Sequence, residues 1–163
     1  MHYHCIALRN HLHSLQLMRD NGLEHEQAPR EKDLMLSRQD QLRFLLAYFA
    51  DGSCNALNRA HVPTAMARLL AVDGVPDSFG FKRAVAEALL ATLDEGSKTD
   101  TTLQQSAILA LGLLGDCDED GLDRRIRSTL MQVKERLADQ QARRFAVIAL
   151  AQAAGRPGSG DGD

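Results

Sequence analysis

The chain has 163 residues and a formal net charge of −3, with 44% hydrophobic and 25% charged residues. This composition is typical of one globular domain, and the negative balance excludes a general attraction to nucleic acid or anionic lipid. We find no apolar run of about 18 residues and no signal peptide, so we expect a cytoplasmic protein that does not enter the membrane. Three separated cysteines, Cys5, Cys54 and Cys117, predict reduced thiols and no disulfide framework.

The first predicted helix occupies residues 1–22, where apolar residues recur in steps of three and four and Asn21-Gly22 forms a stop. Residues 23–36 are charged, contain Pro29 and are expected to form a linker. Ser37 and Asp40 have the spacing of a capping box, which predicts the start of the next helix. That helix buries one apolar face and ends at Gly52.

The remaining chain predicts further helices and no strand, because no segment alternates with period two. Pro63 is expected to start or kink a helix within residues 55–72. The later helices are expected at about residues 77–94, 101–114, 122–137 and 139–154, which gives about seven helices in all. The tail over residues 156–163 is rich in Gly, Pro, Ser and Asp and is expected to be loose.

Two helices of the second half repeat each other. Ala107–Leu111 and Ala146–Leu150 are both continuous apolar runs, and they lie 39 positions apart. The amphipathic helices before them also correspond, since Phe81 and Leu122 begin similar apolar patterns 41 positions apart. A period of about 40 residues is typical of two-helix solenoid units.

The segments SAILALGLLGD (Ser106–Asp116) and FAVIALAQAAG (Phe145–Gly155) resemble the HEAT repeat family, best over residues 79–155. The resemblance implies an all-α fold, a right-handed α-solenoid of about three stacked helical hairpins over residues 37–155. A compact helical bundle is the alternative, but a bundle would not need the 40-residue period. The last apolar helix has no polar cap behind it, so we expect further repeats, a partner or a second copy to cover it.

Two groups of residues have some features of metal sites. Asp116–Gly121 is similar to the first half of a calcium loop, but Arg124 and Arg127 occupy later ligand positions, so helix capping is favoured. The histidines near the N-terminus, His2, His4, His11 and His13, lack paired zinc-ligand spacing and are expected to be ordinary histidines. We therefore expect no metal and no cofactor.

Residues 122–144 carry a net charge of +4 in a chain that is negative overall. A solvated outer face is the simpler interpretation, and a surface for an acidic partner is the functional one. The candidate interaction residues are Arg124, Arg125, Arg127, Arg143 and Arg144. Nucleic-acid binding is disfavoured because Phe145 is the only nearby aromatic residue.

No catalytic motif stands out in the sequence. The leading hypothesis is a non-catalytic scaffold of HEAT-like repeats that binds another protein and belongs to a longer array. The alternatives are an enzyme or enzyme accessory, as in HEAT-like bilin lyases, and a nucleic-acid-binding helical repeat. An enzyme would place titratable side chains together on the concave face.

Overall fold

The computed structural model describes residues 37–71, 78–94 and 99–158. All regular structure in this part of the chain is helical, which confirms the predicted all-α class. The predicted helix over residues 1–22, the linker over 23–36 and residues 159–163 of the tail lie outside the described residues. The helices are α2 (Arg38–Ala50), α3 (Ala56–Ala60), α4 (Val62–Leu70), α5 (Ser78–Asp94), α6 (Thr101–Leu114), α7 (Gly121–Arg136) and α8 (Gln140–Ala154).

The chain divides into two compact units, Met1–Phe44 and Leu45–Asp163. In the first unit, the predicted capping box begins α2. The Asp40 N–H donates to Ser37 Oγ at 3.0 Å, and the Ser37 hydroxyl donates to the Asp40 carboxylate. Arg43 pairs with the same carboxylate at 3.0 Å, so the first turn of α2 is fixed by its own side chains.

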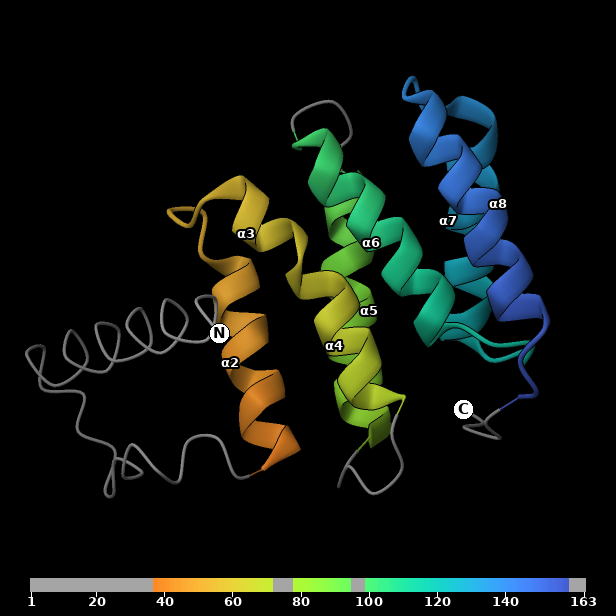
Figure 1. Cartoon of the computed structure of the whole chain (residues 1–163). Coiled ribbons are helices and arrows are strands. Elements are labelled where there is room, and N and C mark those ends of the chain that lie inside the picture. Colours follow the sequence, from red (N-terminus) through yellow and green to blue (C-terminus); the bar gives the residue numbers. More distant parts are fainter. Residues whose placement is uncertain (1–36, 72–77, 95–98, 159–163) are drawn as a thin grey trace, which may run out of the picture. The chain divides into compact units, whose positions relative to one another are not determined.

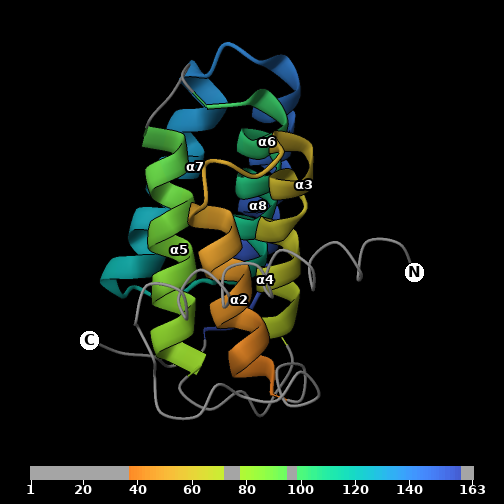
Figure 2. The same ribbon diagram turned by 90° about the vertical axis from the view of Figure 1, so that its left-hand side faces the viewer.

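The second unit is built from two layers of helices. Figures 1 and 2 show α3, α4, α6 and α8 on one side and α5 and α7 on the other. The central helix is α6, which contacts α3, α4, α5, α7 and α8. Eight of its fourteen residues are buried, as its nearly continuous apolar sequence requires.

Among the described helices, α6 and α8 share the most extensive contact. Four alanines of α8, spaced by four, three and four residues, are fully buried: Ala142, Ala146, Ala149 and Ala153. Gly112 lies opposite this stripe, where a β-carbon would come within 2.4 Å of the Ala149 α-carbon. The two backbones therefore approach closely because both contact surfaces consist of very small residues.

Short polar side chains set the helix starts. Asn55, Asp100, Asp120 and Asp139 cap α3, α6, α7 and α8 by accepting backbone N–H bonds from the first turn. The predicted break at Pro63 is present: α3 ends after Ala60, and α4 begins at Val62 with Pro63 in its first turn. The local sequence thus explains most of the helix boundaries.

Replacing Gly112 with alanine tests the close approach of α6 and α8. The added methyl group would overlap the Ala149 backbone, so the helices must move apart. We expect a loss of about 1–3 kcal/mol of unfolding free energy, larger than the roughly 0.5–1 kcal/mol that alanine gains over glycine within a helix. Urea unfolding followed by circular dichroism measures the difference.

Gly52→Ala provides a matched control because nothing lies within 4 Å of the added β-carbon. This exposed change should alter the unfolding free energy by no more than about 0.5 kcal/mol. Equal stability of Gly112→Ala and the wild type would contradict tight α6–α8 packing.

Candidate functional site

An open groove with a volume of about 450 Å³ lies on the layer formed by α3, α4, α6 and α8. His61 and Arg68 line the groove from the α3–α4 side, Gln105 and Leu109 from α6, and Phe145 from α8. Three neighbouring segments of the layer therefore contribute to one surface. Leu109 and Phe145 are half-buried, which leaves aliphatic and aromatic surface open to a ligand.

Side-chain hydrogen bonds connect the helices beneath the groove. The Thr64 and Ser106 hydroxyl oxygens lie 3.4 Å apart and link α4 to α6. Gln105 Nε2 donates to Asp139 Oδ1 at 2.9 Å, which links α6 to the N-terminal cap of α8. The Gln105 amide and the N–H groups of Ala142 and Gln141 hold the pKa of Asp139 below its usual value. These contacts fix the spacing of the helices that form the groove.

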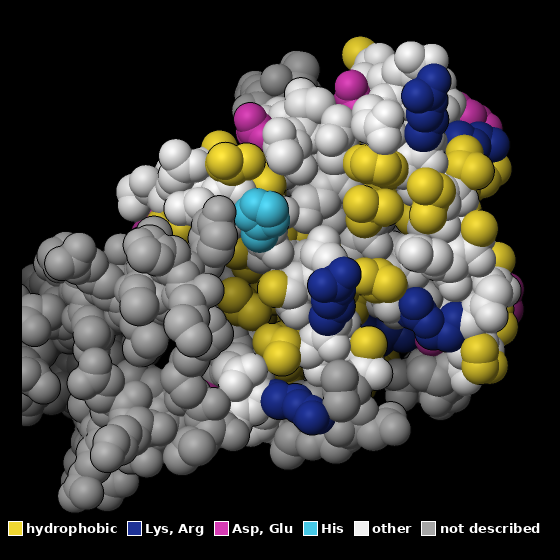
Figure 3. Space-filling model, in the orientation of Figure 1, with side chains coloured by type: hydrophobic (Ala, Val, Ile, Leu, Met, Phe, Trp, Pro, Cys, Tyr) yellow, Lys and Arg dark blue, Asp and Glu magenta, His cyan; other side chains and the backbone are white. Residues whose placement is uncertain are grey.

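The groove is basic in character. His61 and Arg68 are exposed, and neither side chain forms an ion pair or hydrogen bond with any residue that the structure describes. The lining contains no carboxylate. In Figure 3, apolar side chains gather over α6 and α8 with basic side chains among them, while acidic side chains lie mainly at the upper edge. This surface is suited to an acidic ligand with apolar groups.

The structure does not gather the five candidate arginines in one place. Arg124, Arg125 and Arg127 lie in the first half of α7, whereas Arg143 and Arg144 lie in the first turns of α8. The two helices are antiparallel (Figure 1), and α7 is about 24 Å long, so the two groups lie toward opposite ends of the pair.

Four of these arginines have intramolecular partners. Arg124 and Arg143 donate to backbone carbonyls, Arg125 pairs with Glu87 at 2.7 Å, and Arg127 donates to the Asp116 carbonyl at 2.6 Å. Arg144 is exposed and has no partner among the described residues. Binding of a partner by these five arginines stays a prediction. Arg144 is the one whose side chain has no partner among the described residues.

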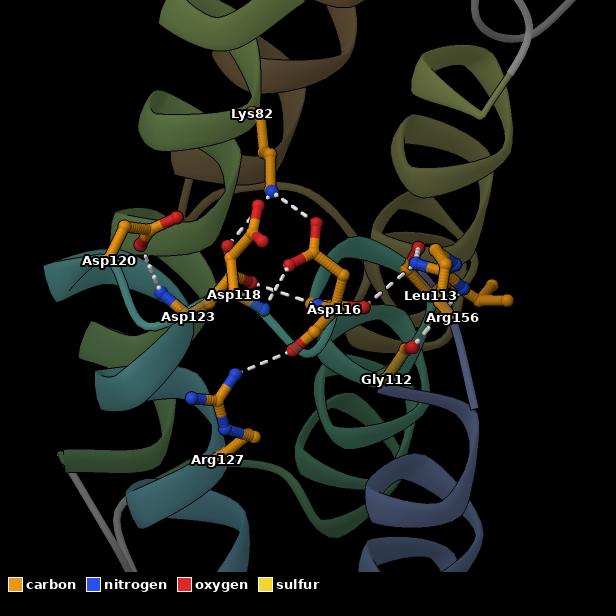
Figure 4. A network of polar contacts seen from close by, with 10 residues as sticks. Lys82, Gly112, Leu113, Asp116, Asp118, Asp120, Asp123, Arg127 and Arg156 are labelled. Atoms are coloured by element: carbon orange, nitrogen blue, oxygen red, sulfur yellow. Dashed lines mark hydrogen bonds and ion pairs between the residues drawn. The ribbon is translucent and has the colours of Figure 1, made fainter. Parts of the chain in front are cut away.

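A buried ion cluster lies between α5, α7 and the loop after α6 (Figure 4). Lys82 Nζ lies 3.0 Å from Asp123 Oδ2 and 3.2 Å from Asp116 Oδ2. The Asp116 N–H donates to Asp123 Oδ1 at 2.9 Å, and the Asp123 N–H donates to Asp120 Oδ1 at 2.8 Å. One ammonium group thus holds two almost completely buried carboxylates and ties α5 to α7.

Burial and charge act in opposite directions in this cluster. Burial alone would lower the pKa of Lys82, but hydrogen bonds and charge from Asp123 and Asp116 outweigh it and raise the pKa. Burial raises the pKa of Asp123 despite the stabilising N–H of Asp116 and the Lys82 charge. Lys82 therefore stabilises the ionised form of Asp123 in a place where burial disfavours it.

The loop resembling half a calcium site is used for helix capping and ion pairing. Asp120 caps α7, Asp116 accepts from Lys82 and from the Asp118 N–H, and Arg127 donates to the Asp116 carbonyl. No group of three potential metal ligands occurs in the part of the chain that the structure describes. The N-terminal histidines lie outside the described residues, so the expectation that they are ordinary histidines is not tested.

Three residues that the sequence did not single out make important contacts between helices. Lys82 is the first. It lies 41 positions before Asp123, which equals the repeat offset, so the repeat itself could have indicated that the two residues are neighbours. Gln105 is the second. The third is Arg156, placed in the loose tail but half-buried, with its guanidinium donating to the carbonyls of Leu113 and Gly115 at the end of α6. A cation is favoured there because helix C-termini carry partial negative charge.

Comparison with protein-family models, curated proteins and solved structures found no match. None of the described helices is long and apolar enough to cross a membrane. The groove, the exposed charges and the packing of the helices are therefore the features that indicate a function.

Replacing Lys82 with methionine tests the buried cluster. The change removes the ammonium group that pairs with the nearly completely buried Asp116 and Asp123, so we expect a loss of about 3–5 kcal/mol of unfolding free energy at neutral pH. The variant should recover stability as the pH falls, because the two carboxyls can then bind protons. In the wild type, the raised pKa of Lys82 contributes stability that is present below the ordinary lysine value of 10.5 and is lost at higher pH.

The adjacent exposed change Arg83→Met is the control and should cost at most about 1 kcal/mol, the contribution of its contact with the Phe79 ring. Adding Asp123→Asn to the Lys82→Met variant should restore part of the stability. A Lys82→Met variant as stable as Arg83→Met would contradict the assigned role of the cluster.

Proposed function

We propose that residues 37–155 are a segment of HEAT-like α-solenoid that binds another protein. The helices follow one another as antiparallel pairs, α5 with α6 and α7 with α8. Helices in equivalent positions of successive pairs pack together, α6 against α4 and α8, and α5 against α7. Equivalent residues lie 39 to 41 positions apart. This regular order favours stacked hairpins over a compact bundle.

The groove between α4, α6 and α8 is the proposed binding surface. The observation that carries the proposal is its combination of half-buried Leu109 and Phe145 with two exposed basic residues, His61 and Arg68, and no lining carboxylate. Apolar anchors supply most of the binding energy in such interfaces, and charges at the rim select and orient the partner. The proposed ligand is an acidic, amphipathic helix with aliphatic side chains at i and i+4.

The same lining favours binding over catalysis. Two of its three hydroxyl groups, those of Thr64 and Ser106, lie within hydrogen-bond distance of each other, and the third belongs to Thr102. General acid–base chemistry uses titratable groups placed together at the substrate. Here a single imidazole and a guanidinium are spread along the groove. The arrangement supports recognition of a charged, partly apolar surface.

A peptide-display experiment tests the groove. A random library of 16-residue peptides is selected against the wild-type chain, and the recovered peptides are assayed by fluorescence polarisation. We expect acidic sequences with aliphatic residues spaced by three or four, and binding that weakens as NaCl rises from 50 to 500 mM because the attraction is partly electrostatic. Arg68→Glu should weaken binding at least tenfold, since it reverses an exposed charge in the groove.

Arg83→Glu is the matched control, because it reverses an exposed arginine on α5, in the other layer. It should leave the affinity within about twofold. Circular dichroism of both variants establishes that they fold. Failure to enrich any peptide, or equal loss of binding in the two variants, would contradict the proposal.

A further inference from the structure

The outward side of α8 exposes a stripe of three apolar residues and one arginine, which we call the end face. It consists of Arg144, Val147 and Ala151, with Ile148 beside them. Val147 is 52% exposed and Ile148 is 46% exposed, which is unusual for large aliphatic side chains on a helix of a packed unit. Arg144, Val147 and Ala151 are three or four positions apart and thus share one side of the helix, and Ile148 is four positions from Arg144 and three from Ala151.

The equivalent side of α6 is covered by α8. Shifting the sequence by 39 positions places Arg144 on Gln105, Val147 on Ile108 and Ala151 on Gly112. Gln105 donates to Asp139 at the start of α8, and Gly112 lies against the Ala149 backbone. Ile108, between them in this stripe, is fully buried. The end face is therefore the repeat-equivalent of a surface that receives a helix within this chain.

The companion helix shows the same difference. Met131 of α7 is 43% exposed, whereas its equivalent 41 positions earlier, Leu90 of α5, is 1% exposed. Both helices of the α7–α8 pair thus expose apolar positions that the preceding pair buries. Exposed apolar residues on both helices favour an interaction surface on this hairpin.

Arg144, the charged residue of the end face, indicates that the partner carries a carboxylate. On α6, the Gln105 amide reaches the carboxylate that caps the next helix, at 2.9 Å. On α8, the equivalent side chain is Arg144, which carries a full positive charge and has no partner among the described residues. An arginine in this place would form a stronger, charge-assisted bond with an aspartate cap than the amide does.

We propose that the end face binds a helical hairpin built like α7–α8, whose second helix lies along α8 as α8 lies along α6. Its N-terminal cap is an aspartate that pairs with Arg144, and its contact stripe is made of alanines. Ala151 has the methyl group that Gly112 lacks, so the bound helix lies farther from α8 than α8 lies from α6. This inference depends on the repeat arrangement proposed above and is independent of a ligand in the groove.

Extending the chain tests the inference directly. Residues 117–158 are appended once more after Asp163, and unfolding in urea is compared with that of the original chain. We expect one cooperative transition with a larger dependence on urea, because the added hairpin buries new surface. Val147→Glu should change the unfolding equilibrium less than about threefold in the original chain, where the side chain is exposed, and at least tenfold in the extended chain.

Leu57→Glu is the matched control, since Leu57 is 62% exposed on α3, away from the end face. It should have the same effect in both chains. Arg144→Glu should weaken the extended chain and leave the original chain nearly unchanged, because Arg144 is exposed and has no partner among the described residues. Arg144→Gln, which reproduces Gln105 of α6, should retain most of the stability of the extended chain. This pair of variants separates a specific contact from general apolar burial.

Two results would overturn the inference. In one, the appended hairpin unfolds separately, or Val147→Glu has equal effects in both chains. In the other, sedimentation shows that the original chain dimerises and that Val147→Glu abolishes the dimer, which would assign the end face to a second copy. Both experiments leave the groove unchanged, so peptide binding there tests the proposed function separately.

Discussion

The close approach of α6 and α8 is the constraint on which the second unit depends. It exists because Gly112 and the four buried alanines of α8 put almost no side-chain volume between the backbones. Small residues reduce the apolar area that each residue buries, yet they increase dispersion contacts between main chains. The larger aliphatic residues of α6 then fill the spaces toward α4 and α5, so one helix contacts neighbours on several sides.

Polar contacts join the ends of the helices, which the apolar core does not hold in place. Lys82 joins α5 to the start of α7, Gln105 joins α6 to the start of α8, and Arg156 returns from the end of α8 to the end of α6. Each contact is made between a helix terminus and a side chain 34 to 43 positions away. Aliphatic surfaces can slide past one another, whereas directional hydrogen bonds fix their relative positions.

Much of the fold could be predicted from the sequence, because helix signals are local. The capping box at Ser37, the break at Pro63 and the expected helix ranges 101–114 and 139–154 lie within a few residues of the observed boundaries. The candidate site could be predicted far less well. The groove combines residues from three segments, and the partners of Lys82 and Arg156 are distant in sequence, so their roles depend on packing that no local pattern specifies.

The position of Arg156 has a consequence for where this unit can be shortened. Regular structure ends at Ala154, and a boundary chosen by secondary structure would fall at Gly155. The side chain of Arg156 nevertheless belongs to the α5–α6 hairpin, because it neutralises the partial negative charge at the C-terminus of α6. A chain shortened at Gly155 would therefore lose the residue that binds the C-terminus of α6.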